Sequence, residues 1–208
     1  PVADYDGDGD LDIAAVISQD EEELWGFENV GDGSFRSRML WRTPNFDLGS
    51  AGLVAADLDG DGDQDLILPA GDNLEDFAAY PQPYHGCLWF ENRGNWQFVK
   101  HRIATLAGTY AAAVGDLDND GDLDIVLVSM ANDWSNPAAA SLVWLENDGR
   151  QQFTTWQIAS APIHLVCTAT GDVDGDGRTD VVTGSLNLRP PFERIGGISV
   201  WRNEGDQP

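Results

Sequence analysis

The sequence predicts an all-β fold built from four repeated antiparallel units, and three repeated features support this prediction. The first is an aspartate-rich segment of nine residues that begins at positions 4, 57, 116 and 172, at intervals of 53, 59 and 56 residues. The second is an apolar segment directly behind it, rich in branched residues and too short for a helix. The third is an alternating segment that ends near a glycine, as a strand entering a hairpin does. Periods of this length are typical of propellers and other repeat arrays.

Each unit is interpreted as four strands in sequence order. A small-residue strand leads into the acidic segment, the apolar strand follows it, and then come a tryptophan-containing strand and a strand that begins with an aromatic residue. We expect the four tryptophans of the third strands to share one position and to fill the gap between units: Trp25, Trp89, Trp144 and Trp201. Alanine and glycine in the first strands fit crowding near a common axis. The pattern predicts a β-propeller or partial propeller of four-stranded antiparallel blades, with repeats at approximately 1–47, 48–106, 107–161 and 162–208.

The acidic segments carry aspartate at places one, three, five and nine and glycine at place six. Like charges at this density repel one another, and a hard divalent cation with 6–8 oxygen ligands relieves the repulsion, which favours calcium. A variable seventh place, which includes Arg178, suits a ligand that uses its backbone carbonyl. An EF-hand would need a glutamate at place twelve, where these segments have Ala15, Leu68, Leu127 and Thr183. The remaining alternative is a solvated acidic turn without metal.

The Asp-x-Asp-x-Asp-Gly-x-x-Asp hairpin, followed by Trp-x-Glu-Asn and a glycine–phenylalanine turn, resembles the FG-GAP/VCBS repeat of integrin α-subunit propellers, secreted bacterial proteins and fungal lectins. The resemblance covers essentially the whole chain and implies about one calcium ion per repeat, four in all. It implies these side-chain ligands: Asp4, Asp6, Asp8 and Asp12; Asp57, Asp59, Asp61 and Asp65; Asp116, Asp118, Asp120 and Asp124; Asp172, Asp174, Asp176 and Asp180. It also implies carbonyl ligands from Asp10, Asp63, Asp122 and Arg178. Such propellers usually have more blades than the four seen here, so we expect part of a larger propeller or an oligomer.

Composition limits the classes of partner and compartment. The formal charge is −25, and the four acidic segments hold 19 of the 36 acidic residues, so the chain is too acidic to favour nucleic acid or anionic membranes. It has no apolar run of about 18 residues, so no membrane span is expected. Calcium loops of this kind, and a start without methionine or signal peptide, favour an extracellular mature product or fragment. Cys87 and Cys167 could form a disulfide or stay free.

Function is expected at the connections between second and third strands, at the end of the blades opposite the acidic segments. The candidate ligand-binding residues in these connections are Tyr80, Tyr84, His85, Trp134, Arg189 and Phe192. They favour a protein or carbohydrate ligand, although any one of them could instead pack locally. No catalytic residue is assigned, because His101 shares its repeat position with Arg38 and Trp156, and His85 and His164 have no identifiable partner. The alternatives are a carbohydrate-active enzyme, such as a lyase or dehydratase, and a structural subunit of a filament or multi-chain assembly.

Overall fold

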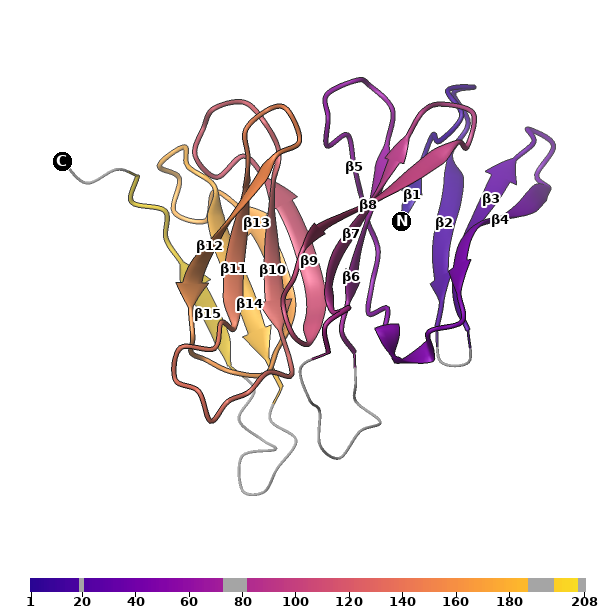
Figure 1. The fold of residues 1–208 in the computed structure, drawn as a ribbon. Coiled ribbons are helices and arrows are strands. Elements are labelled where there is room, and N and C mark those ends of the chain that lie inside the picture. Colours follow the sequence, from indigo (N-terminus) through magenta and orange to yellow (C-terminus); the bar gives the residue numbers. More distant parts are fainter. Residues whose placement is uncertain (19–20, 73–81, 187–196, 206–208) are drawn as a thin grey trace.

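The computed structural model describes residues 1–18, 21–72, 82–186 and 197–205, which form four antiparallel sheets (Figure 1). The first sheet contains β1 (Val2–Ala3), β2 (Asp12–Ile17), β3 (Glu22–Asn29) and β4 (Phe35–Thr43). The second contains β5 (Val54–Ala56), β6 (Asp65–Ala70), β7 (Gly86–Asn92) and β8 (Phe98–Ala104). The third contains β9 (Thr109–Gly115), β10 (Asp124–Ser129), β11 (Leu142–Asn147) and β12 (Phe153–Ala159). The fourth contains β13 (Leu165–Gly171), β14 (Asp180–Ser185) and β15 (Ile198–Trp201), and a 3-10 turn, η1 (Phe46–Leu48), joins the first two sheets.

Every sheet is a meander in which strands that are consecutive in the sequence pair side by side. In Figure 1 the first sheet lies on the right and the second beside it, while the third and fourth sheets overlap on the left. The predicted all-β fold is therefore confirmed, as a partial propeller whose sheets are its blades. In the part of the chain that the structure describes, no helix is long and apolar enough to cross a membrane.

The hydrophobic core lies between blades, and the second strands of the two central blades, β6 and β10, are covered on both faces. Every residue of β6 and of β10 is buried. Leu66 and Phe90 face the first blade and pack with Leu24 in one apolar cluster. Their strand neighbours Ile67 and Trp89 point the other way and pack against the third blade. Alternate residues of one strand thus serve two different junctions, which explains the continuous apolar runs in the sequence.

The prediction that the four tryptophans share one position is wrong. Trp89 and Trp144 pair with Ile67 and Val126, the second residues after the last aspartates of their loops. Trp25 instead pairs with Ala15, and Trp201 with Val181, each shifted by one residue. Because successive strand residues point to opposite faces, this shift places Trp25 and Trp201 on the other side of their blades. The strand pairing is the same in all four blades when the blades are aligned on the asparagine after each tryptophan. It is not the same when they are aligned on the tryptophan itself.

In the first blade the position of Trp89 and Trp144 is taken by Gly26, which pairs with Ala14. The indole of Trp96, from the β7–β8 turn, occupies the space: its Cζ3 atom lies 2.2 Å from where a Cβ on Gly26 would sit. Trp96 is only 6% exposed, and its ring centroid lies 5.1 Å from that of Tyr5. A tryptophan from the neighbouring blade thus fills the gap that an in-strand tryptophan fills elsewhere.

We expect Trp96→Ala to lower the free energy of unfolding by about 3–5 kcal/mol, because the surrounding side chains cannot close the cavity that it leaves. Denaturant unfolding monitored by circular dichroism measures this change. The matched control is Val99→Ala on the adjacent strand, where the side chain is 43% exposed and the expected change is within about 0.5 kcal/mol. Similar losses in the two variants would contradict the packing role of Trp96.

Candidate metal sites

The four acidic loops, residues 4–12, 57–65, 116–124 and 172–180, connect the first and second strands of each blade at the upper end in Figure 1. The glycine at the sixth place of each loop has a positive φ, between 88° and 99°, which favours glycine. The aspartate at the first place accepts a hydrogen bond from the backbone N–H of that glycine, at 2.9 Å in the first loop and 3.1 Å in the third. The sharp turn expected from the sequence is therefore present, and it is closed by the loop's own carboxylate.

Each loop brings carboxylates together closely enough to share one ion. In every loop, three carboxylate oxygens from different residues lie within 4.8 Å of one another. The clusters are Asp4, Asp6 and Asp8; Asp57, Asp59 and Asp61; Asp116, Asp118 and Asp124; and Asp172, Asp174 and Asp180. In the first three, one buried carboxylate oxygen has no hydrogen-bond partner among the described residues: Oδ1 of Asp6, Asp57 or Asp116. Unpaired buried oxygens grouped with other carboxylates fit a hard cation, so these clusters could bind metal.

The aspartates at the ninth place make a contact that the sequence did not reveal. Both oxygens of each accept backbone hydrogen bonds, and all four residues are at most 1% exposed. In the second loop, Asp65 accepts from Leu58 N–H at 3.1 Å and from Asn92 N–H at 2.7 Å. The other three are Asp12, Asp124 and Asp180, and each repeats this pair of bonds. The ninth aspartate thus fastens the loop to the end of the third strand, while its remaining lone pairs still allow metal ligation.

Burial and mutual repulsion shape the charge of the loops. Burial raises the pKa of Asp65 to about 6 and raises the pKa values of Asp12 and Asp124 as well. Burial, and then neighbouring carboxylates, also raise the pKa of Asp59 and of Asp118. A raised pKa means that the folded chain disfavours these carboxylates in their charged form. A bound cation would lower these pKa values again, because it favours the ionised carboxylates.

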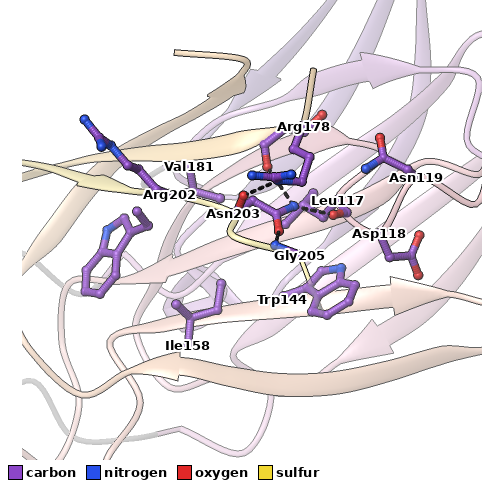
Figure 2. Close-up of a pocket in the computed structure, with 12 residues that line it drawn as sticks. Leu117, Asp118, Asn119, Trp144, Ile158, Arg178, Val181, Arg202, Asn203 and Gly205 are labelled. Carbon is purple, nitrogen blue, oxygen red and sulfur yellow. Dashed lines mark hydrogen bonds between the residues drawn. The ribbon is translucent and has the colours of Figure 1, made fainter. Parts of the chain in front are cut away.

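The asparagine at the end of each third strand joins neighbouring blades. The side-chain amide of Asn92 donates to Gln64 O in its own loop at 3.1 Å and to Tyr5 O in the first loop at 3.0 Å. Asn147 reaches Leu58 O at 3.4 Å, and Asn203 reaches Leu117 O at 2.5 Å (Figure 2). In each case the acceptor is the second residue of the preceding acidic loop. The sequence shows these asparagines in its repeated Glu-Asn and Arg-Asn pairs, but their role depends on a neighbouring blade that the sequence does not place.

The fourth loop differs from the others because two arginines offset part of its negative charge. Arg178, at its seventh place, pairs with Asp176 and donates to Asn203 O at 2.5 Å, beside a cavity of about 360 Å³ between the third and fourth blades (Figure 2). Arg202 Nε lies 3.6 Å from the Asp174 carboxylate. The other blades have acidic residues at both places: Asp10, Asp63 and Asp122, and Glu28, Glu91 and Glu146. The fourth cluster therefore attracts a cation least.

The family comparison agrees with this geometry. The family model described as an FG-GAP-like repeat matches residues 4–68 and 70–127. The chain belongs to the FG-GAP-like repeat family. A search of curated proteins gives no match. The FG-GAP-like matches end at residue 127, yet the fourth acidic loop has the same bonds from Val173 N–H and Asn203 N–H to Asp180.

The candidate ligand-binding residues lie in different surroundings. His85 is buried, with only 1% of its surface exposed, and its Nδ1 accepts from Gly108 N–H at 3.1 Å. The Tyr84 ring lies 5.4 Å from it, and the ring of Trp134 lies 5.8 Å from His164. Tyr80, Arg189 and Phe192 lie outside the described residues. Both cysteines are free, Cys87 buried and Cys167 exposed.

The described histidines form no shared site. His101 Nε2 lies 2.8 Å from Glu91 Oε2, on the outer strand β8. The strand register places His101 in line with Arg38 and Trp156, as predicted, and each of these contacts the matching glutamate. Since three different residue types make the same contact, the pair serves packing at the blade edge. His164 instead contacts Met130 O at 2.9 Å through Nδ1.

We expect Arg178→Asp to raise the affinity of the fourth loop for calcium by roughly tenfold or more, because it replaces a competing cation by a carboxylate. Isothermal titration of the metal-free protein should resolve three tighter sites and one weaker site, and the variant should lose the weaker class. The control Arg42→Asp changes the net charge equally, and Arg42 pairs with Glu23 near the start of β3, at the end of the first blade away from the acidic loop. An unchanged titration for Arg178→Asp would contradict this account of the fourth loop.

Proposed function

We propose that this chain is an extracellular interaction module of FG-GAP-like blades. In this proposal each acidic loop holds one calcium ion in a structural role, and the opposite end of the blades binds a protein or carbohydrate ligand. The observation that carries the proposal is the repetition of one oxygen cluster four times, with an unpaired buried oxygen in three of the four.

Calcium is the cation that this donor set favours. All clustered side-chain donors are carboxylate oxygens, which suit hard cations rather than the soft-ligand sites of zinc or copper. Calcium accepts many oxygen ligands in flexible geometry, whereas magnesium demands a near-ideal octahedron. The proposed ligands are the aspartates at places one, three, five and nine and the carbonyl at place seven. High calcium outside cells would keep such loops filled, which supports an extracellular location.

The ligand surface is proposed at the end opposite the acidic loops. There, residues 130–141 connect two strands, and hydrogen bonds within this segment hold it in place. Asn132 Nδ2 donates to Ala140 O at 3.1 Å, and Asp133 accepts from Ser135 N–H at 3.1 Å. Trp134 lies between these anchors, and its buried indole N–H has no partner among the described residues. Exposed Ser135 and Asn136 follow it. An aromatic ring beside hydroxyl and amide groups can stack on a sugar or anchor a protein partner.

Removal of calcium should lower the melting temperature strongly, because the ions stabilise only the folded chain. Each site contributes about 2.7 kcal/mol when free calcium is a hundredfold above its Kd. Thermal unfolding in calcium, in magnesium and in EDTA measures the effect, and magnesium should restore less stability than calcium. Equal melting temperatures in calcium and EDTA would refute the structural role of the metal.

Ligand binding is tested with a glycan array and a panel of extracellular proteins, probed in calcium and in EDTA. We expect binding in calcium, and at least a tenfold loss for Trp134→Ala, the cost of about 1.4 kcal/mol at an aromatic anchor. Trp156→Ala is the control, since Trp156 is 52% exposed but lies on the outer strand β12. Equal binding by the two variants would remove the 130–141 connection as the ligand surface.

A further inference from the structure

The junction between the first and second blades carries a group of cations on an otherwise acidic chain. It holds four of the 11 Lys and Arg residues, although the formal charge of the chain is −25. The four come from β4 and β8, the outermost strands of the two sheets. They are Arg36, Arg38, Lys100 and Arg102. Both blades are complete four-stranded sheets, so this junction lies within the chain.

The register of β8 points two of these cations toward the first blade. Lys100 pairs with Phe90, and Arg102 pairs with Leu88. Phe90 and Leu88 belong to the apolar cluster that the first two blades share, so their cross-strand partners face the first blade as well. The Lys100 ammonium lies 5.2 Å from the ring centroid of Trp41, which belongs to the first blade.

The register of β4 points the other two cations toward the second blade. Arg38 pairs with Gly26, and its guanidinium carbon lies 5.1 Å from the ring centroid of Trp96. Arg36 lies two residues earlier in the strand and therefore on the same face. Both arginines contact Glu28, with Arg36 Nη1 3.2 Å from its Oε1. Each blade thus places a cation over a tryptophan of the other blade.

The next junction shows that blade packing does not require these cations. Between the second and third blades, the strand register places no lysine or arginine at the four matching positions. In the order of the four cations, the matching residues are Val99, His101, Thr155 and Gln157. Protection of a free sheet edge does not require them either, because β12 is also an outermost strand and has no lysine or arginine. The cations are therefore a property of the first junction rather than of the repeated fold.

Two of the four cations are exposed and have no carboxylate partner among the described residues. They are Lys100 and Arg102. Arg102 Nη2 donates to the backbone carbonyls of Pro83 at 2.7 Å and of His85 at 3.0 Å, which orient the guanidinium but leave its charge in place. On a chain that is acidic elsewhere, such charges attract an anionic partner to this junction while the other surfaces repel it.

We propose that the junction between β4 and β8 binds an acidic peptide in an extended conformation, with aspartate or glutamate at every second position. The two cations of each strand are two residues apart, so each pair repeats at about 7 Å along its strand. Alternate side chains of an extended peptide have the same repeat and point to one side, so its carboxylates can meet the cations in register. This shared repeat favours a peptide over a polysaccharide, whose charges do not follow the strand period.

The free edge of β4 offers a second kind of contact. Among the described residues, no strand pairs with β4 on the side away from β3. An extended peptide can add to such an edge through backbone hydrogen bonds. Its alternate side chains would then lie beside Arg36 and Arg38 on β4, and Lys100 and Arg102 would face them from the second blade.

Fluorescence anisotropy in calcium, with a labelled peptide of alternating glutamate and threonine, tests the proposal. The double variant Lys100→Thr, Arg102→Gln gives β8 the residues of the third blade, so it should fold normally by circular dichroism while its Kd rises about fivefold or more. Lys100→Arg keeps the charge and should bind as the unsubstituted chain does. The control Arg42→Gln, Arg150→Gln changes the net charge equally at exposed sites elsewhere and should also leave the Kd unchanged. Equal binding by the two double variants would overturn the proposal.

Three further measurements test the kind of ligand and its place. A peptide with the same number of glutamates at every third position should bind more weakly, because its carboxylates then alternate between two sides. Equal binding by this peptide would overturn the extended, in-register contact. A sulfated polysaccharide that binds while the alternating peptide does not would overturn the choice of a peptide. Trp134→Ala should leave peptide binding unchanged, and a loss there would instead place the peptide on the 130–141 connection.

Discussion

A continuous path of side-chain-to-backbone hydrogen bonds crosses all four blades, and the arrangement of the blades depends on it. The Asp12 carboxylate accepts from Tyr5 N–H, and the Tyr5 carbonyl accepts from the Asn92 side-chain amide. The Asp65 carboxylate in turn accepts from Asn92 N–H. The same two steps repeat through the third and fourth blades and end at Asp180. Aspartate and asparagine side chains thus provide the polar part of each junction, while the apolar clusters provide most of the buried area. Loss of one aspartate would leave two backbone donors unpaired, which is costly for buried groups.

Most of the fold could be predicted from the sequence because the repeated signals are local. Strand boundaries follow from short apolar runs and glycine turns, and β6 and β10 lie where the apolar segments behind the acidic loops predict strands. The positions of the tryptophans could not be predicted, because a one-residue shift reverses the face of a strand residue. That Trp96 fills the space beside Gly26 could not be predicted either, because it depends on a contact between residues seventy positions apart.

The acidic clusters were predictable for a similar reason, since four or five aspartates within nine residues lie close together in any compact turn. The dual role of the ninth aspartate was not, because its partners Leu58 and Asn92 are reached only after the strands have paired. Charge differences among the loops were visible as Arg178 and Arg202. Their effect depends on the guanidinium groups reaching Asp176 and Asp174, which only the folded arrangement shows.

The acceptor at each junction is a backbone carbonyl, and this has a consequence for how such proteins change over evolutionary time. A carbonyl is present whatever side chain occupies the second place, so tyrosine and leucine both stand there without altering the polar contact. The side chain at that place has only to be apolar and to fit the junction, where Tyr5, Leu58 and Leu117 are buried. A gene segment that encodes one blade could therefore be duplicated, deleted or recombined with another, and the new neighbours would still recognise each other through the same amide.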